Sequence, residues 1–362
     1  MTRPGRAMGR SSGPGVLFVV PAFHTNLYFA TRALVEAGIR THVMAVQAAS
    51  VCPQDHVRPD VMGARPGWGA VRRVLAEARP DLILLRGATP LTHRAALLGR
   101  LQGAALVNYE QKPASRKPHP TQLFRLALGG KPLMRVTPVR LPAPAPPPDS
   151  RAMFLPLPVG PLHPLPAPRQ PSARLRVLAV GKLAQPRKRM LQLIEELLPA
   201  GEAGRVELTL VGSTTLTASR ADEAILSAIR DHAAARPWLR LMEDQPFREM
   251  PALYAAHDVC ILPSSGEPLG SAPLEGMVYG AVPVISSEAG SAGMIREGEN
   301  GLIVDVRQPG QIAAAIDRLA TDRALLARLS AGALDTAAGE LSEAAYVAAV
   351  RVLIASRGRR IG

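Results

Sequence analysis

The sequence predicts an α/β protein with two doubly wound, Rossmann-like domains that face each other across a cleft. Its 362 residues are more than twice the commonest domain size, which favours two domains. In both halves, short apolar runs typical of buried parallel strands alternate with segments of helical periodicity. A proline-rich stretch at residues 142–171 separates the halves, and its prolines disfavour both helix and central strand. We expect it to be an inter-domain linker, in which MFLPLPV, residues 153–159, is a candidate short edge strand.

The N-terminal half begins with a basic, small-residue segment, residues 1–14, which we expect to be disordered. The N-terminal domain is expected to span residues 15–141. Its strands are predicted from apolar runs, and its helices from amphipathic segments that end at glycine. The predicted strands are 16–23, 41–46, 79–87 and 104–109, and the predicted helices are 26–38 and 92–103.

The C-terminal half repeats this alternation over residues 172–340, which we expect to form the second domain. Its strands are predicted at 175–182, 206–213, 239–244, 259–265 and 282–286. Its helices are predicted at 190–200, 221–234, 250–257, 272–280 and 311–339. Residues 341–362 carry a last helix that we expect to pack back on the N-terminal domain. Two such sheets place a ligand cleft between their carboxyl ends, and nucleotides are their usual ligands.

The composition describes a soluble globular protein, with 47% hydrophobic, 20% charged and 4% aromatic residues. No run reaches the roughly 18 apolar residues that a membrane-spanning helix needs, and no signal-peptide cleavage pattern is found, so we expect a cytoplasmic location. Cys52 and Cys260 lie beside apolar residues in different halves, where reduced core cysteines are expected rather than a disulfide or a metal site.

The formal net charge of +14 calls for an anionic partner, although an arginine-rich composition alone is an equal explanation. A nucleic acid, an anionic membrane and a phosphorylated small molecule all qualify. The chain has no aromatic stacking segment and no nucleic-acid reading motif, so we expect no nucleic-acid partner.

Two glutamates flank a turn in the stretch GEPLGSAPLEGM, residues 266–277, which follows a predicted strand. The free amide groups between about Leu269 and Leu274 are expected to form an anion site at the start of the next helix. Glu275 lies one turn into that helix and can accept hydrogen bonds from ribose hydroxyls, whereas Glu267 precedes the turn and can reach a second polyol. The pair suits a sugar–diphosphate–ribose ligand.

A basic turn supports this interpretation. In VGKLAQPRKRM, Lys182 ends a predicted strand and Lys188 lies near the next helix start, so two ammonium groups could converge on the same anion. The alternative is that Arg187, Lys188 and Arg189 form a solvated helix face.

Taken together, these motifs and the segment GAVPVISSEAGSAGMIREGENGLIVD resemble the donor-binding domain of retaining glycosyltransferases of the GT-B fold, family four, over about residues 175–330. The resemblance implies that Lys182 and Lys188 hold the donor diphosphate and that Glu275 holds the ribose. It also implies that Glu267 holds the donor sugar, together with the turn residues Leu269, Gly270 and Ser271.

The chain departs from the family pattern in three places. The turn reads Glu-Pro-Leu-Gly instead of Glu-Gly-Phe-Gly, and Pro268 has no N–H to donate, so the sugar identity does not transfer. The first N-terminal loop, PAFHTNL, has no glycine, and VNYEQKP stands where the family has a histidine. Glu110 and His24 are the candidate acid–base groups there, and a structural or solvated role is the alternative for both.

We therefore predict a metal-independent enzyme that transfers a sugar from a nucleotide diphosphate sugar to an acceptor with retention of configuration, without a cofactor. The N-terminal domain would hold the acceptor: a glycan, a lipid-linked intermediate or a small molecule. The alternative is a catalytically degenerate sugar-nucleotide-binding or partner protein. Peripheral attachment to the inner face of an anionic membrane is expected through the basic segment QKPASRKPH, Gln111 to His119.

Overall fold

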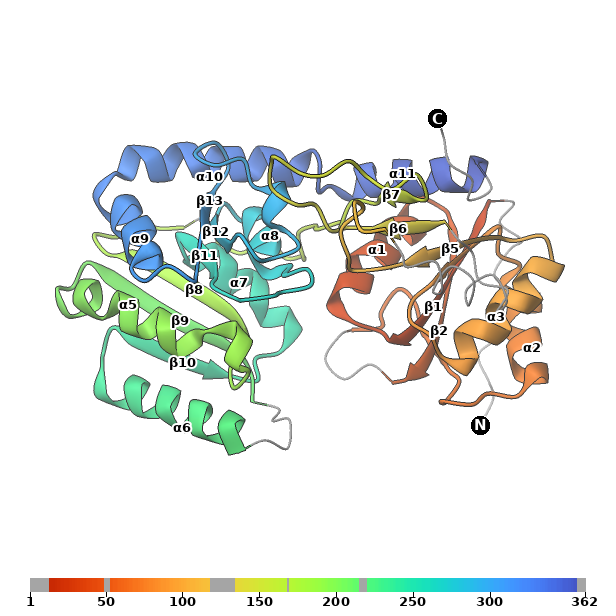
Figure 1. The fold of residues 1–362 in the computed structure, drawn as a ribbon, viewed down its shortest axis with the longest axis horizontal. Coiled ribbons are helices and arrows are strands. Elements are labelled where there is room, and N and C mark those ends of the chain that lie inside the picture. Colours follow the sequence, from red (N-terminus) through yellow and green to blue (C-terminus); the bar gives the residue numbers. More distant parts are fainter. Residues whose placement is uncertain (1–12, 49–52, 118–133, 168, 215–219, 357–362) are drawn as a thin grey trace.

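The computed structural model describes residues 13–48, 53–117, 134–167, 169–214 and 220–356. It contains two parallel α/β domains side by side, bridged by two long C-terminal helices (Figure 1). The expected pair of Rossmann-like domains is thus confirmed. Residues 1–12 of the expected disordered terminus, Cys52, and Pro118 and His119 of the basic segment lie outside the described residues.

The N-terminal sheet has seven strands in the order β3-β2-β1-β4-β5-β6-β7, all paired in parallel. Its strands are β1 Gly15–Ala22, β2 Arg40–Gln47, β3 Asp60–Val61, β4 Leu82–Leu85, β5 Ala105–Tyr109, β6 Arg135–Thr137 and β7 Ala152–Phe154. Its helices are α1 Thr25–Glu36, α2 Trp68–Ala78 and α3 Pro90–Leu101. The helix α2 was not predicted, because it starts after Gly67 without a side-chain cap.

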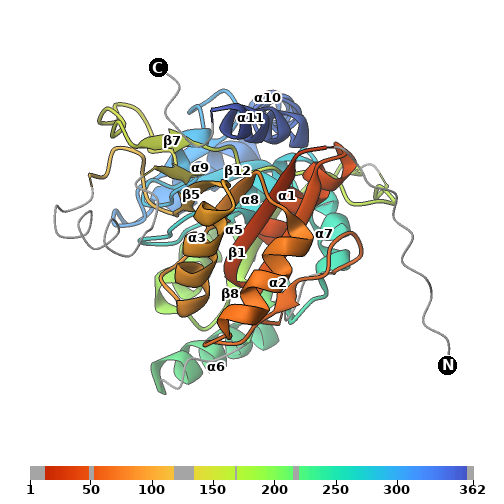
Figure 2. The same ribbon diagram turned by 90° about the vertical axis from the view of Figure 1, so that its right-hand side faces the viewer.

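The period-two alternation of β1 divides its side chains between the two faces of this sheet. Leu17 and Val19 pack toward α2 and α3, which lie together along the domain (Figure 2). Phe18 and Val20 pack toward α1 and the last helix of the chain. Both faces are covered, as expected for a parallel sheet.

The C-terminal sheet has six strands in the order β10-β9-β8-β11-β12-β13. They are β8 Leu175–Lys182, β9 Val206–Ser213, β10 Leu239–Glu243, β11 Val259–Leu262, β12 Val282–Ser286 and β13 Leu302–Val304. The helices are α5 Met190–Glu202, α6 Arg220–Ala235, α7 Met250–Ala256, α8 Ala272–Met277, α9 Gln311–Thr321, α10 Arg323–Ala338 and α11 Glu343–Ala355.

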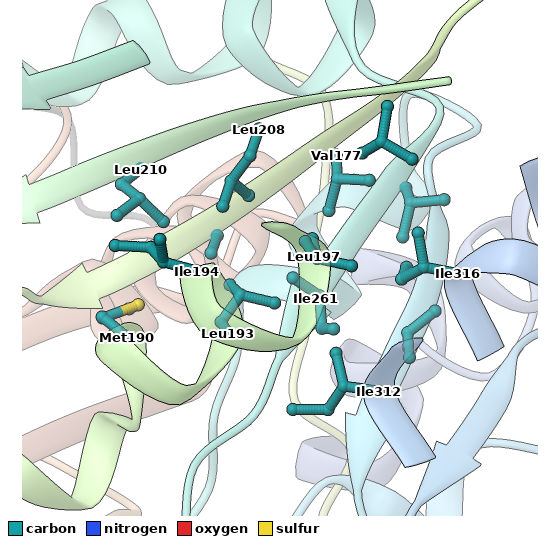
Figure 3. Close-up of a cluster of buried hydrophobic side chains, with 14 of the residues drawn as sticks. Val177, Met190, Leu193, Ile194, Leu197, Leu208, Leu210, Ile261, Ile312 and Ile316 are labelled. Carbon is teal, nitrogen blue, oxygen red and sulfur yellow. The ribbon is translucent and has the colours of Figure 1, made fainter. Parts of the chain in front are cut away.

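The core of this domain forms where α5 lies across the sheet (Figure 3). Met190, Leu193, Ile194 and Leu197 recur at helical spacing and are almost completely buried. They belong to one apolar cluster with side chains from three strands and α9: Val177, Leu208, Leu210, Ile261, Ile312 and Ile316. The burial of these aliphatic side chains fixes the sheet whose carboxyl edge carries the candidate site.

Two expectations about the domain limits need correction. The segment 142–171 is not only a linker, because it contains β7, which pairs with β6 at the edge of the N-terminal sheet and overlaps the candidate edge strand at 153–159. The N-terminal sheet therefore extends beyond residue 141. Residues 13 and 14 are also held, since Pro14 accepts a hydrogen bond from the Arg40 amide at 3.0 Å.

The last helix returns to the N-terminal domain, where α11 lies against α1. Arg32 on α1 forms an ion pair with Glu343 on α11 at 2.7 Å and donates to the Pro161 carbonyl at 3.0 Å. Tyr346 and Val350 of α11 are buried in the N-terminal core. The chain thus crosses between the domains a second time.

Candidate functional site

A cavity of about 450 Å³ lies between the two domains at the carboxyl ends of their strands. Figure 1 shows the carboxyl end of β8 and the start of α1 on facing sides of the two domains. The N-terminal domain contributes His24, Thr25, Asn26, Arg86 and Gln111 to the cavity wall. The C-terminal domain contributes a larger set, which includes Gly181, Arg187, Lys188, Phe247, Tyr254, Glu267, Leu269, Gly270, Ser271 and Glu275.

Glu267 is the centre of a buried charge cluster in the wall. Its Oε2 accepts hydrogen bonds from Lys188 Nζ at 2.6 Å and from Arg187 Nη1. The Lys188 and Glu267 side chains are 10% and 9% exposed, so this ion pair is largely removed from water. Burial lowers the pKa of Lys188, and the Glu267 carboxylate opposes that shift. The structure therefore excludes the solvated helix face as the role of Lys188.

Local backbone geometry explains how Lys188 reaches this position. The 3₁₀ helix η1, Pro186–Lys188, ends at Arg189 in a left-handed conformation with φ of 53°, and α5 begins at the next residue. A Cβ at Gly181 would lie only 3.3 Å from Cδ and Cε of Lys188. The glycine of the VGK motif thus leaves room for the lysine stem across the end of β8.

Glu275 lies on α8, and its carboxylate is held by two hydroxyl groups. Tyr254 donates to Oε2 at 3.0 Å, and Ser271 donates to Oε1 at 2.8 Å. Burial raises the pKa of Glu275, and these two hydrogen bonds oppose the shift. The carboxylate is therefore oriented before any ligand arrives.

The turn between the glutamates is fixed by close packing. Gly270 has φ of 79°, and a Cβ there would lie 2.2 Å from Leu262 Cδ2. The Ser291 amide donates to the Leu269 carbonyl at 2.9 Å. The amide groups of Gly270 and Ser271 have no acceptor within the described ranges, so they remain available at the cavity wall.

The expectation that Lys182 converges with Lys188 in the cavity wall is wrong. It is exposed at the end of β8 and does not line the cavity, where Arg187 is the second cation beside Glu267. Lys182 nevertheless lowers the pKa values of both His24 and Lys188, so its charge acts on the two sides of the cleft.

The two N-terminal candidates have different positions. His24 lines the cavity at the start of α1, and burial, Arg86 and Lys182 together lower its pKa. Glu110 lies outside the cavity, where its Oε2 is 3.8 Å from Nη1 of the buried Arg135. Gln111, the second residue after β5, lines the cavity instead, which corrects the expected placement of Glu110 near the reacting group.

Several polar cavity residues were missed as candidates, among them Arg86, Gln111, Arg187 and Tyr254. Arg86 directly follows β4, and the rule that ligands bind at the carboxyl ends of parallel strands could have identified it. No group of three or more metal-ligating side chains gathers anywhere in the part of the chain that the structure describes. Within the same residues, no helix is both long and apolar enough to cross a bilayer.

The two Rossmann-like domains with a cavity between them define the GT-B class of proteins. Residues 174–322, in the C-terminal domain, match the family model described as glycosyl transferases group 1. The predicted resemblance is confirmed over this segment.

Curated relatives match part of the chain. A lipopolysaccharide core biosynthesis glycosyltransferase of Rhizobium meliloti is 37% identical over 103 residues, which are 28% of this chain and 30% of the relative. A D-inositol 3-phosphate glycosyltransferase of Frankia alni is 29% identical over 184 residues, 48% of this chain and 45% of the relative. The chain therefore spans less than half the length of these relatives.

Solved structures match nearly the whole chain at low identity. Anabaena HepE in complex with UDP and glucose has a TM-score of 0.71 at 15% identity, covering 95% of this chain and all of HepE. Sucrose-phosphate synthase from Thermosynechococcus elongatus has a TM-score of 0.68 at 16% identity, covering 94% and 98% of the two chains. These similarities establish the GT-B fold.

Proposed function

We propose that this protein is a glycosyltransferase that moves a sugar from a nucleotide diphosphate sugar to an acceptor with retention of configuration. The observation that carries the proposal is the arrangement of Lys188, Glu267 and Glu275 around one inter-domain cavity, within a domain of the glycosyl transferases group 1. The N-terminal domain holds the acceptor in this proposal.

Different residues would bind the different parts of the donor. The Glu275 carboxylate, already oriented by Tyr254 and Ser271, accepts hydrogen bonds from the ribose hydroxyls. The Lys188 ammonium and the Arg187 guanidinium take the diphosphate, with Lys182 adding its charge from the strand end. The amides of Gly270 and Ser271 complete this side of the site.

Glu267 has a double role in this proposal. Without ligand it is the counter-ion that keeps Lys188 and Arg187 in place. When the diphosphate takes those cations, the carboxylate is free to accept hydrogen bonds from hydroxyls of the donor sugar, in concert with the backbone of Leu269. Exchange of one anion for another avoids leaving a buried ammonium without a partner.

The reaction would then proceed by charge stabilisation. The bond between the anomeric carbon and the diphosphate oxygen breaks, the acceptor oxygen bonds to the same face, and its proton passes to the departing diphosphate. The cations neutralise the charge that develops on the leaving group, so no resident metal or cofactor is needed in this scheme.

The test is a panel of nucleotide sugars, with UDP sugars first, measured by thermal shift and then by product formation or donor hydrolysis. We expect stabilisation by one donor class and turnover with an acceptor extract. Lys188→Ala should lose both, whereas Arg318→Ala, which changes an exposed cation on α9, should lose neither. A panel that leaves the wild-type protein unstabilised would overturn the proposal.

The alternative is a sugar-nucleotide-binding protein without catalytic activity. It is favoured by the first N-terminal loop, which lacks glycine, and by the placement of Glu110 outside the cavity. Donor binding at normal affinity without product or hydrolysis, across the acceptors tested, would favour this alternative.

We also propose a cytoplasmic location with peripheral attachment to an anionic membrane. Lys112, Arg116 and Lys117 of the basic segment are on the surface of the N-terminal domain. Each such cation near an anionic surface contributes about 1 kcal/mol. Co-sedimentation should be stronger with anionic than with neutral vesicles and should be lost as salt is added. Equal, negligible binding to both kinds of vesicle would contradict membrane attachment.

A further inference from the structure

Arg86 is a cation in the cavity wall whose side-chain contacts are with uncharged groups. It follows β4 on the N-terminal wall, donates from Nη2 to Gln111 Oε1 at 2.9 Å, and stacks 5.8 Å from the centre of the Tyr109 ring. Among the residues that the structure describes, no carboxylate lies within ion-pair distance of Arg86. The side chain is half-buried, so its guanidinium is directed by these two contacts while its charge is not neutralised.

The surroundings of Arg86 also favour a negative charge. Thr25 and Asn26, at the start of α1, line the same cavity, and the first turn of this helix contains no acidic residue. The His24 carbonyl accepts from the amides of Leu27 and Tyr28, which leaves the amides of Thr25 and Asn26 without an acceptor within the described ranges. The lowered pKa of His24 means that this ring does not compete as a cation near neutral pH.

The opposite wall has its own groups for the donor. Arg187 and Lys188 line it together with the carboxyl groups of Glu267 and Glu275, and Lys182 adds its charge from outside the wall. The proposed function assigns these groups to the diphosphate, the sugar and the ribose of the donor. Arg86, on the other domain, is left for a second anion.

We propose that Arg86 binds an anionic group, a phosphate or a carboxylate, on the acceptor substrate. This inference rests on the proposed function, because it assigns the acceptor to the N-terminal wall. The guanidinium can donate two parallel N–H groups to either anion, and its contacts with Gln111 and Tyr109 hold it at the cavity wall. The acceptor hydroxyl would then be positioned beside the donor sugar through a charged group of the same molecule.

The experiment uses the full chain saturated with UDP, so that the diphosphate site is filled. Glucose 6-phosphate, glucuronate and neutral glucose are titrated by calorimetry. Monomeric short-chain phosphatidylinositol and phosphatidylcholine test whether a lipid carries the anion. At least one anionic probe should bind ten times more tightly than glucose or phosphatidylcholine. Arg86→Gln should reduce that affinity at least tenfold, and Arg86→Lys should reduce it less.

Two controls test whether the loss of anion binding is specific to Arg86. Arg94→Gln removes another guanidinium that stacks on an aromatic ring of the same domain, 5.3 Å from the Trp68 ring centre, and should leave anion binding unchanged. UDP affinity should change less than twofold in Arg86→Gln, and thermal unfolding should show that the variant is folded.

The inference is overturned if UDP displaces the anionic probes, if charged and neutral probes bind alike, or if Arg86→Gln binds them as the wild type does. Equal losses of UDP and probe affinity in Arg86→Gln would assign Arg86 to the donor instead. If UDP does not bind the wild type but Arg86-dependent anion binding persists, the donor proposal fails while the anion site remains.

Discussion

The two sides of the inter-domain cavity are organised differently. On the C-terminal side, Glu267 is paired with Lys188 and Arg187, and Glu275 is held by Tyr254 and Ser271. On the N-terminal side, Arg86 is supported by a neutral amide and an aromatic ring.

This difference means that one side of the cavity is pre-organised for a particular ligand geometry, whereas the other side is not. Groups that hold one another in the absence of ligand lose little conformational freedom when a ligand binds, and thus favour one ligand geometry. A side that offers Arg86 and the two backbone amides of Thr25 and Asn26 specifies a charge more than a shape. We infer that the C-terminal side sets the donor and the N-terminal side sets only the charge of the acceptor.

The largest effect is expected from Lys188→Ala, which removes a buried ammonium of the organised side. Turnover should fall by about 100-fold or more, because a group that stabilises developing charge contributes on this scale. Initial rates with the identified donor provide the measurement. A loss below threefold would show that the charge cluster serves stability alone.

Lys182→Ala tests whether the strand-end lysine acts on the same diphosphate. We expect a smaller loss than for Lys188→Ala, because Lys182 is exposed and outside the cavity wall. The double variant should lose less than the product of the two single effects, since both charges would act on one group. Strictly multiplicative losses in kcat/KM would contradict a shared target.

Glu275→Ala should weaken donor binding by roughly 1.5 to 3 kcal/mol, because it removes a charged acceptor of hydrogen bonds. Calorimetric titration with the donor measures this loss. Glu223→Ala, at an exposed position in the first turn of α6, is the matched control and should bind normally. Unchanged donor affinity in a folded Glu275→Ala protein would show that Glu275 does not bind the ribose.

Glu275→Gln should stabilise the ligand-free protein at neutral pH while it weakens the donor site. The pKa of Glu275 is raised above the ordinary 4.5, so its contribution to stability is fully present below that value and is lost as the pH rises. Glutamine carries no charge to bury. The Tm advantage of the variant should therefore grow as the pH rises above 4.5, and thermal unfolding across this range measures it. An advantage that does not change with pH would contradict this account.

The smallest effect is expected from Glu110→Gln, which changes a carboxylate outside the cavity. Activity should stay within about twofold of the wild type, because the substitution alters a 3.8 Å contact with Arg135 and no contact in the cavity wall. His24→Asn provides the contrast, since His24 lines the cavity and should affect kcat/KM more. A tenfold loss in Glu110→Gln would restore Glu110 as an acid–base candidate.

Most of the fold could be predicted because its strands are buried on both faces and therefore read as continuous apolar runs. The predicted strand at 175–182 coincides with β8, and the one at 206–213 coincides with β9. The short strand β7 escaped a firm assignment because three residues among many prolines carry little periodic signal.

The sequence by itself determined the two-domain architecture, the position of the donor-side turn and the two glutamates around it. These depend on local apolar periodicity and on the order of residues within one short segment. Only the tertiary structure decided which charges meet. Arg187 rather than Lys182 joins Glu267 in the cavity wall, and Gln111 rather than Glu110 reaches the cavity. The physical reason is that a residue after a strand end can point to either side of the sheet, and the packing of distant segments decides between the two. The Ser265 amide, for example, donates to the Arg187 carbonyl at 2.8 Å and so holds the basic turn beside the strand that precedes Glu267.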